Sequence, residues 1–589
     1  MAKLVALIPF VLLASGCSRS PGALSGLSEE FVNKTLSFSP SAATAAGLHV
    51  VGKDNLDDML DDLSPASLDK QRLYYQGFRN RLGELKADQL TPEDQADVGL
   101  MRDQCSLQIQ ELTEVQSAVH NPTLYTEIVG QALFTPFVLE YAPKADRIRH
   151  IMARLQKIPL LLSQAATNLI KMPPVWTQLA LAENQANLSL VDETIRADVP
   201  ANLRDAYARA AMPALSAMHK YEDFLKSNTG DPREADWRLG ARYSQKFRFT
   251  MNAGTEADSM LQAATLDMAK MRAHMMELAL PLHAKLAPAH HDHTELSGDA
   301  RENKVVGEVL AHIAERHSTR DSYLDDARKY LEEARAFVQE KHLLTLPAQS
   351  NLQVIPTPEF ERSVYATGGF VSAPPLEPRL GAFYWITPIP KEWSDEQAES
   401  KLREYNEFML RLVTLHEAIP GHYVQFEIAN GIQPPARRVL RAIYGSGPYV
   451  EGWAQYSEQA MLEAGYLNHS PELELTFAKQ QLRVVANAIL DVRLQMLNMT
   501  DAEALEFLEK QAFQEHQEAV EKLQRAKATS TQLPTYYVGW KAWVKLREEY
   551  KNAKGAAFSL ADFHDRALRE GPVPLSALGG LLQQAEKQP

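Results

Sequence analysis

Two histidines and a glutamate within seven residues are the side chains of this chain best suited to chemistry: His416, Glu417 and His422. Imidazoles bind zinc, and a carboxylate beside a zinc ligand can take a proton from a water molecule. Two histidines that share one ion on a helix usually stand four residues apart, where about 40° separates their directions. A separation of six residues places them roughly 120° apart. An undistorted helix therefore cannot direct both imidazoles to one ion.

Pro420 and Gly421 lie between the two histidines and can supply the distortion. Proline lacks the N–H that would bond the His416 carbonyl, and its ring crowds that carbonyl. Glycine adopts backbone angles that are closed to other residues. We predict a widened or broken turn that brings His422 beside His416, since helix irregularities are often found at functional sites. The alternative is that the turn simply ends a core helix and that both histidines are hydrogen-bonded locally.

A third metal ligand is expected from a following helix. When one helix supplies two histidines, a glutamate usually completes the protein ligands and water takes the fourth position. Glu451 meets this expectation because it lies near the start of a helical pattern over residues 449–458. Glu427 and Glu458 compete with it, and spacing alone does not choose among the three.

One long amphipathic helix is predicted to lead into His416. Ser394 and Gln397 have the spacing of a capping box, which marks a helix start. Apolar residues then recur every three or four positions, and continuing the series reaches His416, so its imidazole points inward. These inner positions are Leu402, Tyr405, Met409 and Leu412. The other face alternates in charge and is predicted to be solvated and paired along the helix, at Glu399, Arg403, Glu407 and Arg411.

The rest of the chain predicts a mostly α-helical fold with a small β-sheet beside the metal-binding helix. Apolar and charged residues mix at helical spacing in five long stretches, which are 100–115, 145–169, 203–228, 257–286 and 303–340. Two short β-prone runs bounded by proline and glycine, 351–356 and 382–387, precede the metal helix. Residues 243–251 are predicted to form a further short strand.

The position of the two β-prone runs matters for function. An extended peptide is commonly held by pairing with the edge of a sheet, and these runs come just before the histidines. The alternative interpretation is a small structural ribbon.

The first residues resemble a bacterial lipoprotein signal. A short basic start and an apolar run end in Ala14-Ser15-Gly16-Cys17, and the run is too short for a mature membrane span. We predict cleavage before Cys17 with lipid on its sulfur, a flexible tether over 18–26, and, from Ser18, an outer-membrane location facing the periplasm. The alternative is an ordinary secretory signal with an incidental cysteine.

Composition excludes some classes of protein. The chain has 45% hydrophobic and 23% charged residues and a formal net charge of -14, which suits an acidic globule and argues against nucleic-acid binding. With Cys17 lipidated, only Cys105 remains, so no internal disulfide is expected. Membrane attachment is expected through the lipid alone, and the sequence does not indicate an oligomeric state.

Two other polar clusters are predicted to have no catalytic role. His290-His291-Asp292-His293 lies in a polar connection between Pro288 and Gly298, and we expect an exposed loop there. The acidic run over residues 54–62 lacks the spaced ligands and glycine of a calcium loop, so a solvated helix face is expected.

The ordered set of motifs resembles the bacterial domain of unknown function 885 family, over essentially the whole mature chain. The motifs are His-Glu-Ala-Ile-Pro-Gly-His at 416–422, Glu-Gly-Trp-Ala-Gln-Tyr-Ser-Glu at 451–458, Tyr-Tyr-Val-Gly at 536–539, Phe-His-Asp at 563–565 and Pro-Leu at 574–575. That family is regarded as zinc metallopeptidases with a glutamate third ligand.

The resemblance implies a role for each matching residue. His416, His422 and Glu451 would bind zinc, and Glu417 would be the general base. Tyr536 matches the family's Tyr-x-x-Gly element, and we extend this to stabilisation of the oxyanion. One departure stands out, because many relatives have Asp-Thr-Gly-x-His where this chain has residues 491–495, ending in glutamine.

We therefore expect one helical metallopeptidase-like domain over 27–589, with a helical N-terminal half (27–342) and a half that carries the metal site (343–589). The predicted activity is zinc-dependent hydrolysis of peptide bonds at the cell envelope, with Glu417 passing the proton of water to the leaving amine. The alternative is a non-catalytic lipoprotein of the same fold that binds peptides or cell-wall fragments.

Overall fold

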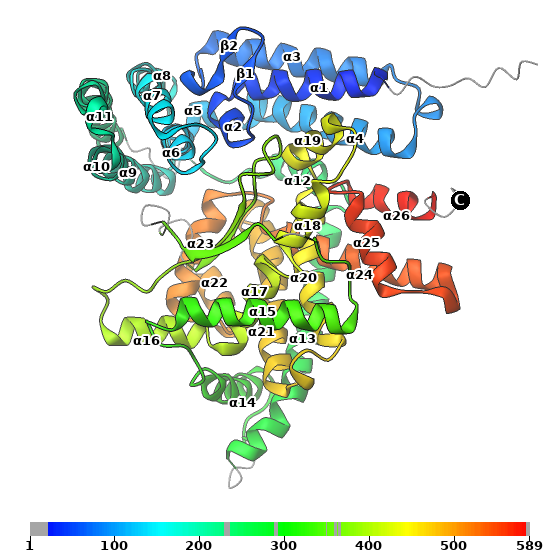
Figure 1. The fold of residues 1–589 in the computed structure, drawn as a ribbon. Helices are drawn as coiled ribbons and strands as arrows, with labels where there is room; N and C mark the ends of the chain where they lie inside the picture. The colour runs from blue at the N-terminus through cyan, green and yellow to red at the C-terminus, as the bar shows by residue number, and fades with distance from the viewer. Residues whose placement is uncertain are drawn as a thin grey trace, which may run out of the picture.

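The computed structural model describes residues 22–228, 236–287, 292–348, 350–358, 362 and 367–584. The predicted signal peptide, Cys17 and most of the predicted tether lie outside these residues. Helices make up most of the described chain, with one three-stranded sheet near its middle (Figure 1). The prediction of a mostly α-helical fold with a small sheet is confirmed.

The N-terminal helices pack around two hydrophobic cores of their own. The first core joins α1 (Gly22–Phe38), α2 (Pro40–Ala45), α3 (Pro65–Gly83) and α4 (Pro92–Gln110). The second joins α6 (Thr123–Val138), α7 (Lys144–Leu155), α8 (Ile158–Asn168), α9 (Pro174–Ser189) and α11 (Arg204–Ser227), with short α5 (Ser117–His120) and α10 (Arg196–Asp198) between them. These helices form the blue to green-cyan part of Figure 1.

The third and largest core consists mainly of the sheet and of helices that follow α11, with Ala96 of α4. Its helices are α12 (Arg242–Met251), α13 (Ala257–Leu286), α14 (Gly298–Ile313), α15 (Tyr323–Lys341), α16 (Asp395–Glu404), α17 (Glu407–Glu417), α18 (His422–Ala429), α20 (Gly447–Glu463), α21 (Pro471–Met496), α22 (Asp501–Glu506), α23 (His516–Ala528), α24 (Pro534–Lys554), α25 (Leu560–Arg569) and α26 (Leu575–Gln584). Helices α12–α15 thus pack with residues after 343, although they precede that position.

Helix α19 (Pro435–Tyr444) joins this body to the N-terminal helices. Val439 and Leu440 are buried in the first core, against α1 and α4. Arg441 is almost fully buried and donates to Asp97 of α4 at 2.7 Å. An apolar contact and a buried ion pair therefore fix the same interface.

The sheet consists of β3 (Leu352–Pro356), β4 (Gly368–Val371) and β5 (Ala382–Ile386) in the order β3-β5-β4. Strand β5 is parallel to β3 and antiparallel to β4. Both predicted β-prone runs form strands, and β4 between them was not predicted. A separate antiparallel pair is very short: β1 (Val50–Val51) and β2 (Asp54–Asn55).

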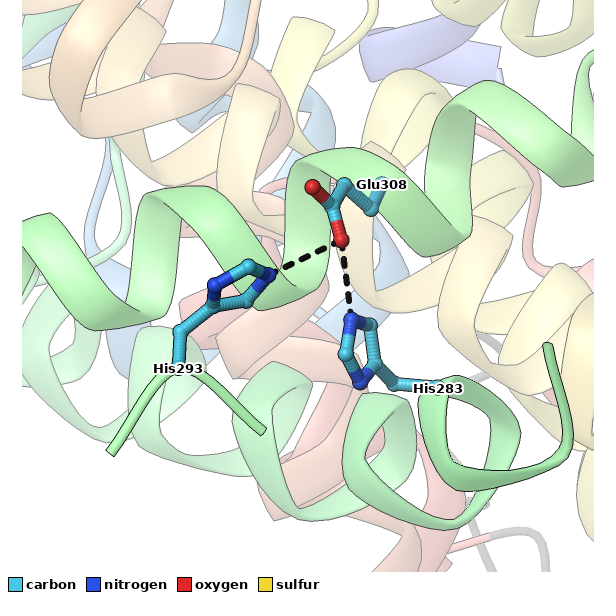
Figure 2. A group of neighbouring side chains, drawn as sticks. All are labelled: His283, His293 and Glu308. Carbon is cyan, nitrogen blue, oxygen red and sulfur yellow. Dashed lines mark hydrogen bonds and ion pairs between the residues drawn. The ribbon is translucent and has the colours of Figure 1, made fainter. Parts of the chain in front are cut away.

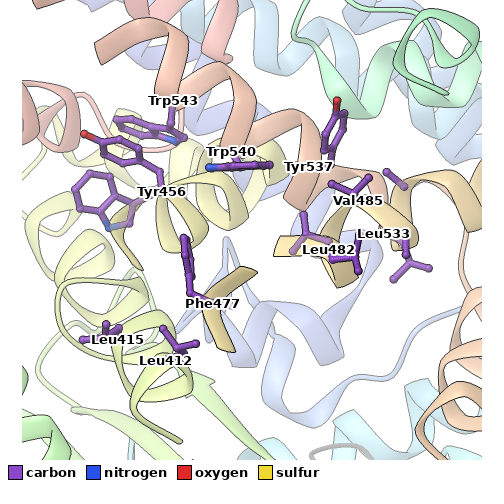
Figure 3. Close-up of a cluster of buried hydrophobic side chains, with 14 of the residues drawn as sticks. Leu412, Leu415, Tyr456, Phe477, Leu482, Val485, Leu533, Tyr537, Trp540 and Trp543 are labelled. Atoms are coloured by element: carbon purple, nitrogen blue, oxygen red, sulfur yellow. The ribbon is translucent and has the colours of Figure 1, made fainter. Parts of the chain in front are cut away.

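The core beneath the candidate site is built from four helices. Figure 3 shows apolar and aromatic side chains of α17, α20, α21 and α24, and Leu533 just before α24, packed together. The labelled residues are Leu412, Leu415, Tyr456, Phe477, Leu482, Val485, Leu533, Tyr537, Trp540 and Trp543. This packing holds the segments that carry the candidate ligands in fixed relative positions.

Three local predictions were wrong. Residues 243–251 lie in α12, because Tyr243, Phe247 and Met251 are buried at four-residue spacing despite their β-prone side chains. In the acidic run, Asp57 and Asp61 are buried rather than solvated. They accept hydrogen bonds from hydroxyl groups of α2 and the residue before it.

The third wrong prediction was the exposed loop around His293. His290 and His291 lie outside the described residues, but His293 is only 6% exposed. Asp292 and His293 both bond side chains of the neighbouring helices, and only Asp292 is partly exposed.

The predicted long helix before His416 is two helices. The capping box of Ser394 and Gln397 starts α16 as predicted, but α16 ends at Glu404. Asn406 then starts α17, since its side chain accepts from the N–H groups of Phe408 and Met409. An asparagine is a strong N-cap residue, so this second start was readable in the sequence.

The charges of this region pair across elements more than along the helix. Arg411 is buried and bonds Glu333 of α15, and Glu407 pairs with Arg316.

Among the described helices, none is long and apolar enough to cross a membrane.

Candidate metal centre

The predicted break between the histidines is present. Helix α17 ends at Glu417 and α18 begins at His422. The Gly421 N–H donates to the Leu415 carbonyl at 3.0 Å, across the interrupted turn. A side-chain carbon on Gly421 would lie 1.9 Å from the His416 carbonyl oxygen, so the turn requires glycine. The break brings the two imidazole centroids to 4.8 Å.

Glu451, from the second turn of α20, meets both imidazoles. Its Oε2 lies 3.7 Å from His416 Nε2 and 3.5 Å from His422 Nε2, and the three atoms lie within 4.8 Å of one another. Atoms bound to one tetrahedral zinc are roughly 3.3 Å apart, given zinc–ligand distances of about 2.0–2.1 Å. The spacing of these atoms therefore suits a single ion.

The two competing glutamates lie elsewhere. Glu458 is fully buried and its Oε1 is 2.8 Å from His416 Nδ1, on the far side of the ring from Glu451. Gln455 Nε2 also lies near this nitrogen, at 3.2 Å. Glu427 is not part of the cluster and hydrogen-bonds with Asn430. Geometry thus favours Glu451 as the third ligand and gives Glu458 the position of an outer carboxylate that orients a ligating imidazole.

Burial sets the electrostatics of the cluster. Burial alone would raise the pKa of Glu451, but the His416 and His422 imidazoles hold it well below its usual range. Burial raises the pKa of Glu458 despite the adjacent His416. Among the described residues, Glu451 Oε2 has no hydrogen-bond partner, although it is buried. A buried carboxylate oxygen aimed between two imidazoles, with a second carboxylate behind one of them, fits a zinc ion.

The Glu-Gly-Trp segment of α20 positions the cluster by three separate contacts. Glu451 faces the histidines, and the Trp453 indole N–H donates to the Pro420 carbonyl at 2.9 Å, which supports the broken turn. Gly452 lies against Gly539 of α24, where a side-chain carbon would come within 2.3 Å of the Gly539 backbone. The helices α20 and α24 are therefore in backbone contact at the level of Glu451.

This contact gives a stability prediction. Gly539→Ala would place a carbon 2.0 Å from the Pro448 carbonyl oxygen and force the helices apart. We expect a loss of about 1–3 kcal/mol in the free energy of unfolding, as for other overpacked sites. Gly580→Ala is the control, because this helical glycine has open space around it. Denaturant unfolding measures both, and equal stability of the two variants would contradict the proposed contact.

Tyr536 lies in the first turn of α24, close to the cluster. Its ring stacks on His416 with 6.4 Å between centroids. Burial and the nearby Glu451 raise the pKa of its hydroxyl above the usual range, so the group stays protonated and able to donate. Gln532 donates to that hydroxyl at 3.4 Å.

Glu417 faces the sheet. Its Oε2 accepts from the N–H of Phe370 in β4 at 3.0 Å. In the described part of the chain, β4 is an edge strand that pairs with β5 alone. The Phe370 N–H therefore points away from β5, and the free edge of the sheet lies beside the residue predicted to be the base.

The Phe-His-Asp motif contacts the segments that carry the site. Tyr456 of α20 bonds His564 at 2.8 Å, and His564 Nδ1 contacts the Leu343 carbonyl at 2.7 Å. Asp565 accepts from the N–H of Thr345. The Phe-His-Asp element thus fastens the segment before β3 to α20 and α25.

The departure at Gln495 has a structural explanation. Its side chain accepts from the Leu239 N–H and donates to the Thr529 carbonyl. Asp491, buried nearby, accepts from Tyr243 and from the Thr531 N–H. An amide supplies both a donor and an acceptor, so Gln495 can join the loops before α12 and α24.

A cavity of about 460 Å³ adjoins Glu451. Its lining comes from α4, α12, the start of α20 and the loop before α24, and polar residues are common in it: Gln104, Gln108, Lys246, Ser530 and Gln532 are examples. The cavity gives space for a ligand beside the candidate metal centre.

Sequence reasoning missed Phe370, Trp453 and Gln455 as site residues. Trp453 and Gln455 lie inside the quoted 451–458 motif, which was a usable signal. Phe370 had none, because its role depends on a main-chain N–H at a strand edge.

This is a mostly helical protein with a His-His-Glu cluster at a broken helix. The chain matches the family described as "Bacterial protein of unknown function (DUF885)" over residues 40–582 and belongs to that family. No curated protein matches it.

Two solved structures share the fold. One is "a putative lipoprotein of unknown function from Shewanella oneidensis", with 28% identity, a TM-score of 0.80, and coverage of 95% of this chain and 100% of the other. The second is "the putative lipoprotein from Colwellia psychrerythraea", with 19% identity, a TM-score of 0.77, and coverage of 96% and 99%.

Proposed function

We propose that this protein is a zinc-dependent peptidase. The observation that carries the proposal is the joint position of Glu417, next in sequence to His416 of the candidate metal centre and hydrogen-bonded to the free edge of β4. A purely structural metal centre has no need of a carboxylate at that place. An extended peptide that pairs with the free edge of β4 would lie beside Glu417.

Each residue then has a distinct task. His416, His422 and Glu451 would hold a zinc ion, which would lower the pKa of a water molecule and polarise a carbonyl. Glu417, oriented by the Phe370 N–H, would take the proton of the water and deliver it to the leaving amine. The Tyr536 hydroxyl would donate to the oxyanion that forms on the carbonyl oxygen. Glu458 and Gln455 would keep the His416 ring in position.

A peptide-library digest tests this function. The full chain, purified in detergent and loaded with zinc, is incubated with a mixture of short peptides, and mass spectrometry identifies new ends. We expect cleavage that a chelator stops and added zinc restores. The absence of cleavage by the zinc-loaded protein, together with retention of peptides on it, would favour the non-catalytic binding protein.

Two observations support a proposal for the cellular location. Both solved structures are described as those of a "putative lipoprotein", and the sequence ending in Cys17 has the form of a lipoprotein signal. We therefore propose that the protein is lipid-anchored at the cell envelope, with the outer membrane as the predicted membrane.

Cys17→Ser tests the anchor. The substitution removes the sulfur that would carry lipid, so labelling with a radioactive fatty acid should be lost and the protein should leave the membrane fraction. Cys105→Ser is the control, because Cys105 is buried in the first core and its removal should leave labelling intact. A Cys17→Ser protein that stays as tightly membrane-bound as the parent would overturn the prediction.

A further inference from the structure

A second cluster of two imidazoles and a carboxylate lies at the connection between α13 and α14. It consists of His283 in the last turn of α13, His293 in the connection and Glu308 in α14. The two histidines are 1% and 6% exposed. Figure 2 shows both imidazoles directed at the same oxygen of Glu308.

The distances are close to those between ligands of one ion. Glu308 Oε2 lies 2.9 Å from His283 Nε2 and 3.0 Å from His293 Nε2. The three atoms are within 4.8 Å of one another, as in the cluster around Glu451. Ligands of one tetrahedral zinc lie roughly 3.3 Å apart, so small shifts would admit an ion.

The outer nitrogens of both rings face carboxylates. His283 Nδ1 lies 3.0 Å from Asp292 Oδ1, and His293 Nδ1 lies 3.2 Å from Glu295 Oε1. An imidazole that donates from Nδ1 to a carboxylate presents a lone pair at Nε2, and histidine ligands of zinc are typically held in this way. Both rings are thus oriented with Nε2 toward Glu308.

The connection is bent to bring these groups together. Asp292 and His293 have φ values of 47° and 53°, a left-handed conformation that is uncommon for residues other than glycine. Arg301 donates to the Asp292 carbonyl at 3.0 Å and fixes this bend. Three segments, the end of α13, the bend and α14, therefore converge on one point.

Glu308 is suited to ligation. Both imidazoles face one of its carboxylate oxygens, Oε2. Lys304 occupies the other oxygen, Oε1, at 2.9 Å, which leaves Oε2 directed toward the imidazoles. The Glu308 side chain is 38% exposed, so an ion can reach the cluster from solvent.

We infer that His283, His293 and Glu308 form a second divalent-metal site, separate from the candidate centre at His416, whose ion fastens the α13–α14 connection. Zinc is the favoured ion because two of the ligands are imidazoles. The role of this ion is structural, since its ligands come from two helices and from the bend between them. The inference does not depend on peptidase activity.

Metal counting on single variants tests this site. The full chain is stripped with a chelator, reloaded with zinc, desalted and analysed by mass spectrometry for metal. We expect two zinc ions per chain in the parent and one in Glu308→Gln and in His293→Ala. Glu308→Gln preserves the shape of the side chain, and circular dichroism checks that each variant is folded.

The matched control is Glu277→Gln on α13. Glu277 pairs with His274 at 3.6 Å, and both side chains are exposed, so this histidine–carboxylate pair lacks the buried arrangement. It should keep two zinc ions. His416→Ala, which removes a ligand of the other centre, should keep the ion at Glu308.

The outcomes separate the two centres. A parent with one zinc ion that Glu308→Gln retains would overturn the second site and leave the peptidase proposal standing. A parent whose one zinc ion is lost in Glu308→Gln and kept in His416→Ala would support the second site and contradict the first.

Discussion

Glu417→Gln should lower peptide hydrolysis by roughly two or more orders of magnitude while leaving zinc content and folding unchanged, since this is the usual contribution of a positioned acid–base group. The amide keeps the size of the side chain and can still accept from the Phe370 N–H, but it cannot take a proton from water. Initial rates on a peptide identified in the library digest measure the effect.

Glu427→Gln is the matched control for this variant. Glu427 lies ten residues further on, in α18, is partly buried, and hydrogen-bonds Asn430 outside the candidate centre. Its amide variant should keep the parental rate. Loss of zinc together with activity in Glu417→Gln would make Glu417 a ligand, and an unchanged rate would show that Glu417 is not the general base.

His416→Ala and His422→Ala should each lose the zinc ion at the candidate centre, because a glutamate and one histidine rarely hold zinc well. Zinc titration of the stripped protein measures this, and each variant should bind one equivalent fewer than the parent. Glu458→Gln should instead weaken zinc binding by about 10–100-fold, which is typical when an outer partner of a ligating histidine is removed.

The His422 variant bears directly on the six-residue spacing. A folded His422→Ala protein that binds as much zinc as the parent would show that the broken turn serves the helix end alone. Glu427→Gln, tested alongside, should bind zinc like the parent, and a loss there would return Glu427 to the ligand set.

Local backbone chemistry made part of the site predictable. The break between His416 and His422 was predicted from Pro420 and Gly421, and α17 does end there. The turn at residue 421 leaves no room for a side chain, so it requires glycine. The start of α16 followed from the capping box of Ser394. Both signals act within a few residues, where spacing determines geometry.

Contacts distant in sequence were not predictable in the same way. Spacing could not choose between Glu451 and Glu458, because the choice depends on which side of the His416 ring each one reaches. The burial of His293 depends on a bend that places it against Glu308 of α14. The role of Gly539 depends on the contact between α20 and α24, and the residues around Gly539 in the sequence do not indicate that contact.

Anomalous diffraction at the zinc absorption edge, from crystals of the full chain grown with zinc, tests the candidate centre most directly. We expect a peak between His416 Nε2, His422 Nε2 and Glu451 Oε2, on the side of the His416 ring away from Glu458. Well-ordered density for these three side chains without an anomalous peak between them would contradict the assignment of the metal and, with it, the proposed peptidase.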